Sequence, residues 1–193
     1  HQYGAWTITS EEYADFVRRC DDEIGNLAWA APQDWMCEEK ALRRSGLSVK
    51  NHLENTVANF LDLRQRLGYL VIPVLQGWHR DDYLECWDMY EKRGVDLSSE
   101  KVVGVGSICR RGEGYEISKI LDDLQPLNLH GFGIKGRSFM ENIDKLTSAD
   151  SMAWSFTARH GEPLPECTHN KCNWCYKYAD RWRNRIFNNV VDG

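Results

Sequence analysis

Long apolar runs are missing from this sequence. No stretch of about 18 apolar residues occurs, so nothing predicts a membrane-spanning helix. A secretory signal pattern is also absent, because the first residues are polar and aromatic and lead straight into a helix-like segment. There is no internal repeat and no low-complexity linker. The 193 residues of the chain, 42% hydrophobic and 27% charged, have the composition of one globular domain.

An excess of positive charge is missing too. The formal net charge is −5, so the chain lacks a sequence-wide basic footprint for nucleic acid. Local basic groups occur at Arg43 and Arg44, Arg110 and Arg111, Lys135 and Arg137, and Arg181, Arg183 and Arg185. The simplest interpretation is solvated surface charge. These groups form a phosphate track only if the fold gathers them at one rim.

A disulfide framework is the third absence. The count of seven cysteines is odd, and four of them are spread singly, at Cys20, Cys37, Cys86 and Cys109. Scattered thiols fit a reducing compartment better than a disulfide-stapled fold. We therefore expect a cytoplasmic protein.

Apolar runs and helical patterns alternate along the chain. Runs typical of buried strands occupy residues 26–32, 68–77, 100–108, 128–136 and 148–156. Helical patterns occupy residues 10–24, 48–67, 79–94, 114–127, 136–146 and 176–187. This alternation predicts an α/β fold with a parallel sheet, because each crossover helix returns the chain to the same edge.

Polar or glycine-rich residues follow the apolar part of every predicted strand. They are Gln33 and Asp34, Gln76, Gly104 to Ser107, Gly131 to Lys135, and Asp150. An open sheet uses one crevice, whereas a barrel builds its site from all its strand ends. We therefore predict a (β/α)8 TIM barrel. It is incomplete, because five units are legible and the first strands are missing.

Two carboxylates stand at predicted strand ends. Asp34, framed by Pro32 and Trp35, is either a helix cap or an acceptor for a flat ligand edge such as that of guanine. Asp150 by itself is a cap or turn residue in the simplest interpretation. If both lie in one mouth, one carboxylate binds a base and the other attacks a sugar carbon.

Other strand-end residues allow two interpretations each. Gln76 either holds a base or satisfies loop backbone. The glycines at 104 and 106 either form a tight turn or let backbone N–H groups approach a ligand. Phe132 is a stacking lid or a core residue, and His130 is more typical of a structural histidine than of a catalyst.

The densest chemical signal lies near the end of the chain. Cys167, His169, Cys172 and Cys175 have C-x-H-x2-C-x2-C spacing, which suits tetrahedral Zn²⁺ in a closed, structural site. His160 is a spare candidate for the fourth ligand. We expect a partial TIM-barrel domain over residues 1–160, and a zinc-binding segment with a C-terminal helix over residues 161–193.

Six stretches in order resemble the tRNA-guanine transglycosylase superfamily. They are LAWAAPQDWMCE, VIPVLQGW, VGVGSICRR, LHGFGIK, ADSMAWSFTAR and the cysteine cluster, and they span about residues 5–185. The closer resemblance is to the DNA-acting branch, the deazapurine DNA modification transglycosylases of bacteria and phages. It implies a zinc-bearing TIM barrel and a pentosyltransferase that replaces guanine in DNA with a 7-deazaguanine derivative through a covalent aspartyl-sugar intermediate.

The resemblance also implies residue roles. Asp34 matches the base-recognising aspartate, Gln76 the glutamine that helps to hold the base, and Asp150 the nucleophile. Gly106 and Ser107 fall where backbone contacts a base oxygen, and Phe132 falls where a hydrophobic side chain covers the base. The cysteine cluster falls at the zinc site, with His169 where relatives often have cysteine.

One family motif has no counterpart. The Asp-Ser-Gly-Gly-Phe motif, which carries a second catalytic aspartate, is missing, and HQYGAW is similar to the sequence just downstream of it. We therefore expect a fragment or a truncated protein, and whether it is active alone is open. The alternatives are the same chemistry on tRNA, an inactive zinc-stabilised nucleic-acid-binding fragment, or an unrelated barrel enzyme for a small phosphorylated metabolite. A homodimer is also open.

Overall fold

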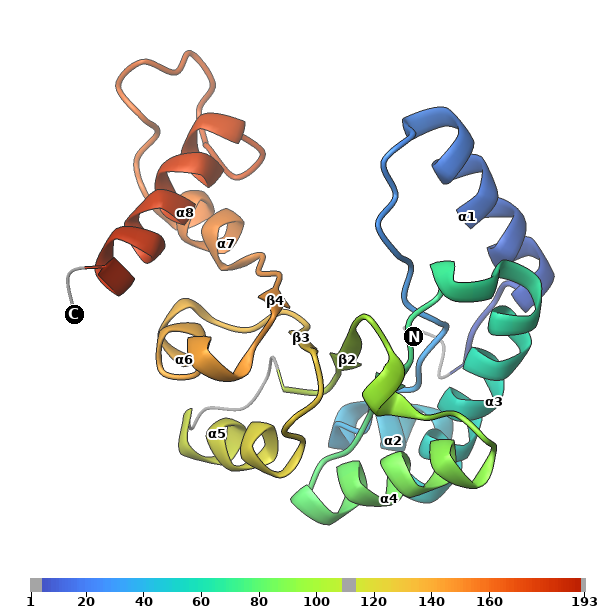
Figure 1. Cartoon of the computed structure of the whole chain (residues 1–193). Helices are drawn as coiled ribbons and strands as arrows, with labels where there is room; N and C mark the ends of the chain where they lie inside the picture. The colour runs from blue at the N-terminus through green and yellow to red at the C-terminus, as the bar shows by residue number, and fades with distance from the viewer. Residues whose placement is uncertain (1–4, 109–113, 192–193) are drawn as a thin grey trace.

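A single parallel sheet forms the centre of the molecule. The computed structural model describes residues 5–108 and 114–191, and Cys109, Arg110 and Arg111 lie outside the described residues. The strands are β1 (Val74–Leu75), β2 (Val103–Val105), β3 (Leu129–Gly131) and β4 (Ser148–Ala149), paired in the order β1-β2-β3-β4 (Figure 1). The predicted α/β class with a parallel sheet is confirmed.

The first predicted strand is reduced to one bridge. Ala30 pairs in parallel with Val71, accepting from Ile72 N–H at 3.0 Å and donating to Leu70 O at 2.8 Å. The next ladder bond on this side would need an N–H from Pro32, which has none. The prediction of a full strand over residues 26–32 was therefore wrong, because only Ala30 pairs, and it pairs with Val71 just before β1.

Eight α-helices surround the strands in the described part of the chain. They are α1 (Ser10–Ile24), α2 (Glu39–Ser45), α3 (Val49–Leu67), α4 (Arg80–Lys92), α5 (Gly114–Asp123), α6 (Gly136–Met140), α7 (Ala153–His160) and α8 (Tyr176–Val191). Short 3-10 turns lie at η1 (Gly68–Leu70), η2 (Leu97–Ser99) and η3 (Ile143–Lys145). Capping boxes at Thr9 and Ser48 start α1 and α3, so these two helices begin where side-chain acceptors for backbone N–H groups are available.

One helix was missed and one predicted strand was wrong. Nothing in the sequence reasoning predicted the short helix α2. The predicted strand over residues 148–156 ends at Ala149, and α7 begins at Ala153, where Ser151 Oγ accepts the Ala153 N–H at 3.2 Å. Ser155 and Ala158 then face inward at helical spacing. The apolar run there belongs to a buried helix turn, which periodicity alone does not distinguish from a strand.

The helices form an outer layer around the sheet. Helix α3 packs on α4, α4 on α5, and α5 on α6, while α1 packs on α3 and α6 on α8. Figure 1 shows this succession around the strands, with α1 and α8 at the two ends. The core between the layers holds fully buried side chains such as Phe60, Tyr90, Val105 and Leu121.

The sheet is strongly curled. Trp29, beside β1, and His130, on β3, lie three strand positions apart, which is about 14 Å in a flat sheet. Their ring centroids are only 4.8 Å apart. The curl therefore makes a concave inner face, and the aromatic rings of these two residues meet across it.

The curl does not close into a barrel within residues 5–108 and 114–191. Strands β1 to β3 are buried, whereas both residues of β4 are only partly buried, and β4 ends the strand order. Beside it a cavity of about 720 Å³ opens between β4, α6 and α8, with Phe139, Trp154, Trp182 and Ile186 among its lining residues. A complete TIM barrel is therefore not formed.

None of the helices in the described residues has the length and apolar character that crossing a membrane requires.

Candidate active site and metal centre

The strand register aligns the candidate residues in two rows across the sheet. Val74, Gly104, His130 and Ser148 are paired neighbours along one row. Side chains alternate between faces, so the residues two positions further on form a second row at the carboxyl edge. That row consists of Gln76, Gly106, Phe132 and Asp150. Asp34 follows the Ala30 bridge and reaches the same edge through its hydrogen bond to Gln76.

The Asp34 end of the row is a buried hydrogen-bond chain. Cys37 N–H donates to Ser107 Oγ at 2.9 Å, and Ser107 Oγ donates to Gln76 Oε1 at 2.7 Å. Gln76 Nε2 in turn donates to Asp34 Oδ2. Because both ends of the amide are engaged, the orientation of Gln76 is fixed, and it aims an N–H at the carboxylate of Asp34.

The hydrogen-bond series that ends at Asp34 requires a glycine at position 106. A Cβ atom there would lie 2.1 Å from Gln76 Nε2, so the glycine lets the amide of Gln76 lie against the backbone. The next residue, Ser107, has a φ of +55°, a left-handed conformation that is strained for a non-glycine residue. Its two hydrogen bonds hold it there.

Burial changes the pKa of Asp34. Its carboxylate is partly buried, and burial raises its pKa to about 6, with the hydrogen bond from Gln76 acting in the opposite direction. Gln76 itself is fully buried. The structure therefore brings Asp34 and Gln76 together, and the partly exposed Asp34 is easier for a ligand to reach than the buried Gln76.

The Asp150 end is open. The side chain of Asp150 is 54% exposed, and its Oδ1 accepts the Gly133 N–H at 2.9 Å. The Nε2 atom of His130 lies 3.4 Å from the same oxygen. The interaction with His130 is the main reason that the pKa of Asp150 is lowered, which favours the ionised carboxylate.

An aromatic floor lies between the two ends. The Phe132 ring lies 4.7 Å from the ring of His130 and 6.2 Å from that of Trp29. A Cβ at Gly104 would lie 2.4 Å from Phe132, so this ring rests directly on the β2 backbone. Phe132 is partly buried and belongs to the floor of the concave face, where its exposed side remains available for stacking.

Sequence reasoning missed His130 as a site residue. It is buried, its Nδ1 lies 2.8 Å from Ser148 Oγ, and its Nε2 faces Asp150. A signal was present: His130 and Ser148 each lie two positions before a candidate residue, Phe132 and Asp150, and period-two spacing puts them on the same face. Trp29, the other missed residue, had no comparable signal.

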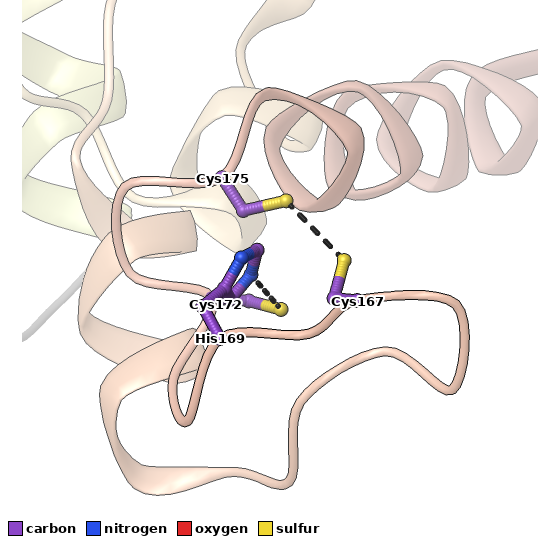
Figure 2. Close-up of side chains that lie close together, drawn as sticks. All are labelled: Cys167, His169, Cys172 and Cys175. Carbon is purple, nitrogen blue, oxygen red and sulfur yellow. Dashed lines mark hydrogen bonds between the residues drawn. The ribbon is translucent and has the colours of Figure 1, made fainter.

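The cysteine cluster comes together as predicted. Figure 2 shows Cys167, His169 and Cys172 on the loop between α7 and α8, converging with Cys175 at the start of α8 (Figure 2). The four ligand atoms lie within 4.8 Å of one another. His160, the spare candidate, is exposed, stacks near Phe156 and is not part of this group.

The donor set fits a tetrahedral metal. Two sulfur atoms bound to one Zn²⁺ are about 3.8 Å apart, given Zn–S bonds of about 2.3 Å. The Sγ atoms of Cys167 and Cys175 are 3.7 Å apart, and His169 Nε2 lies 3.1 Å from Cys172 Sγ. Backbone N–H groups at the start of α8, first that of Tyr178, lower the pKa of Cys175 and favour the thiolate that a metal binds.

These features define a class: an α/β protein with two carboxylates at one curled sheet edge and a Cys₃His cluster that could hold a metal ion. The chain matches the family model DpdA, deoxypurine in DNA protein A, over residues 1–192. It therefore belongs to this transglycosylase-like family of deazapurine DNA modification, which acts on DNA. The predicted resemblance is confirmed. No curated protein matches the chain.

Proposed function

We propose that the chain carries the base-exchange site of a transglycosylase that replaces guanine in DNA with a 7-deazaguanine derivative. One observation supports this most: two carboxylates share a sheet edge but have opposite environments. Asp34 is partly buried and hydrogen-bonded to an amide, as a base-binding acceptor would be. Asp150 is exposed and has a lowered pKa, as a nucleophile would need.

Asp34 reads the base in this proposal. The ring N–H and the exocyclic amine of guanine are two parallel donors, and the carboxylate of Asp34 accepts from them. The buried amide of Gln76 holds that carboxylate in place, and Ser107 holds Gln76. Gly106 gives the amide its room. Guanine and 7-deazaguanine share the recognised edge, so one pocket accepts both.

Asp150 performs the exchange. The guanine leaves the base stack and enters the mouth, with its exposed face against Phe132. A carboxylate oxygen of Asp150 forms a bond to the sugar C1′ as the bond from C1′ to N9 breaks. The electron pair leaves with guanine, which takes a proton from water. The incoming deazaguanine then gives its N9 proton to water and displaces Asp150 from C1′. Two inversions retain the configuration.

Zn²⁺ is the proposed metal at Cys167, His169, Cys172 and Cys175. Its role is structural, since four protein ligands leave no open position for chemistry. It ties the loop after α7 to the first turn of α8, and α8 packs on α6 and α7. We expect a chelator to remove the hydrogen-exchange protection of α8 while that of α3 persists.

The curled sheet is proposed to be a sector of a (β/α)8 barrel. The outer succession of helices and the contact between Trp29 and His130 support this. Further strands would pair with the half-buried edge of β4. Residues 1–160 then form the barrel part, and residues 161–193 the zinc-binding segment with the C-terminal helix.

The DNA strand is proposed to run near the Asp150 end. Helix α6, which carries Arg137 and follows Lys135, packs on the basic helix α8, and Arg137 is paired with Glu141. Arg181 is paired with Glu166, and Arg183 lies over the Phe187 ring, so Arg185 is more available than these two arginines of α8. We propose these residues as part of the phosphate track that the sequence left open.

Base exchange tests the proposal directly. The 193-residue chain with bound Zn²⁺ is incubated with labelled guanine or 7-cyano-7-deazaguanine and with double-stranded DNA, single-stranded DNA or tRNA in separate reactions. Incorporation of label into DNA alone supports the proposal. Incorporation into tRNA alone assigns the tRNA alternative, and binding of DNA without exchange or adduct assigns a non-catalytic module.

A further inference from the structure

His130 connects the floor of the concave face to Asp150. It lies on β3, is 5% exposed, and its imidazole is bounded by Trp29 and Phe132 at ring distances of 4.8 and 4.7 Å. Ser148 Oγ lies 2.8 Å from Nδ1. The ring is thus fixed by packing on its faces and edges and by a polar partner on one nitrogen.

The second imidazole nitrogen of His130, Nε2, faces Asp150. Nε2 is buried and has no hydrogen bond among the described residues, and Asp150 Oδ1 is 3.4 Å away. Catalytic hydrogen bonds are often long in unliganded structures and tighten with substrate. The imidazole makes ring contacts with Trp29 and Phe132 and polar contacts with Ser148 and Asp150, and of these four residues Asp150 is the charged one.

Both contacts of Asp150 fall on one oxygen. Oδ1 accepts the Gly133 N–H and faces His130 Nε2, whereas Oδ2 has no partner among the described residues. We propose that His130 is a positioning residue, which together with the Gly133 N–H holds Oδ1 of Asp150 and leaves Oδ2 as the atom that attacks C1′. Only the attack of Oδ2 on C1′ rests on the proposed base exchange.

The tautomer follows from this arrangement. For Nε2 to donate to Asp150, a neutral imidazole must accept at Nδ1, and the hydroxyl of Ser148 supplies that hydrogen bond. Ser148 precedes Asp150 by two residues on the same strand end, so one short segment sets both the tautomer and the carboxylate.

Paired substitutions of His130 test the contact. His130→Gln retains an N–H near the position of Nε2, His130→Asn retains one near Nδ1, and His130→Leu retains neither. His160→Leu, on the exposed end of α7, is the matched control. The pKa of Asp150 is followed by carbon NMR of labelled aspartate, with the signal assigned by its loss in Asp150→Asn.

The expected result separates the variants. His130→Leu and His130→Asn should raise the pKa of Asp150 by about 1 unit and slow adduct formation with DNA about 10-fold, with little change in the KM for DNA. His130→Gln and His160→Leu should stay close to wild type. If Asp150 titrates alike in folded wild type and His130→Leu, or if His130→Gln is as impaired as His130→Asn, the proposal is overturned.

The readouts also separate two kinds of failure. If wild type forms no adduct with DNA, the proposed base exchange fails. The NMR titration still decides in that case whether His130 positions Asp150.

Discussion

The Asp34 end and the Asp150 end of the carboxyl edge differ in the surroundings that the protein gives a carboxylate. At one end, Asp34 is partly buried, and its pKa is raised to about 6 by burial. At the other, Asp150 is exposed, and its pKa is lowered, chiefly through His130. The carboxylate of Asp34 is held by a series of hydrogen-bonded side chains that leads into the core. The carboxylate of Asp150 is held by a histidine and a loop N–H at the open edge of the sheet.

This difference teaches that surroundings can fit the same chemical group for the two tasks proposed for Asp34 and Asp150. A base-binding acceptor gains strength from a poorly solvated place, where hydrogen bonds to a charge are strong. A nucleophile needs its negative charge at neutral pH and an approach path for the substrate. Environments that push two carboxylates apart in pKa are typical of sites with divided roles.

The largest effect is expected from a substitution of Asp150. Asp150→Asn keeps an oxygen for the Gly133 N–H but removes the charge, so covalent adduct with DNA should fall by at least about 1,000-fold. The adduct is measured on denaturing gels. Asp144→Asn, an exposed neighbour, serves as control. Persistence of the adduct in Asp150→Asn excludes this residue as the nucleophile.

A smaller effect is expected at the Asp34 end. Asp34→Asn replaces an acceptor of two donors, and each hydrogen bond to a charged group contributes about 1.5 kcal/mol or more, so guanine affinity should fall about 100-fold. Calorimetric titration with guanine measures this, with Asp22→Asn on the exposed face of α1 as control. Unchanged affinity would move base recognition away from Asp34.

Gly106→Ala tests the Asp34 end indirectly. It displaces the amide that holds Asp34 and leaves Asp34 itself unchanged. The new Cβ would meet Gln76 Nε2 at 2.1 Å, so the amide must shift. We expect unfolding to become easier by about 2 kcal/mol and guanine affinity to fall about 10-fold. Gly161→Ala, whose nearest contact is Thr157 O at 3.4 Å, is the control for denaturant melts. Equal behaviour of the two variants would contradict the fixed position of Gln76.

The smallest expected effect is on stability against pH. Folding raises the pKa of Asp34, so the protonated form stabilises the fold below about pH 4, and this contribution is lost as pH rises to about 6. Asp150 acts oppositely: its stabilisation is present above about pH 4 and is lost in more acid solution. Between pH 4 and 6, wild type should therefore lose on the order of 1 kcal/mol relative to Asp34→Asn.

Urea melts of the two proteins at several pH values measure that difference. Parallel curves for wild type and Asp34→Asn across this window would show that Asp34 titrates normally.

Much of the fold could be predicted, because local patterns carry it. Helix α1 was predicted with the bounds it has, from helical spacing and an acidic first turn. The parallel sheet followed from alternation. Two strand predictions failed. At the first predicted strand, Pro32 lacks the N–H that the next hydrogen bond between the strands would need. The apolar run after Asp150 folded as the helix α7 instead of a strand. Periodicity does not distinguish a short buried strand from a buried helix turn.

The candidate site divides in the same way. The Cys₃His cluster that could hold a metal ion was predictable, since its four residues lie within nine positions and short spacing alone brings them together. The strand-end residues could be named, because parallel strands end at one edge. That Gln76 is buried and holds Asp34 could not be predicted, since it depends on a glycine on the neighbouring strand.

By itself, the sequence determined which residues stand at strand ends and which four form the cluster that could hold a metal ion, because both depend on neighbours along the chain. Only the tertiary structure decided that Asp34 is sheltered, that Asp150 is exposed, and that His130 faces it. The physical reason is the curl of the sheet, which brings Trp29 against His130 and sets burial and charge contacts between residues about 100 positions apart.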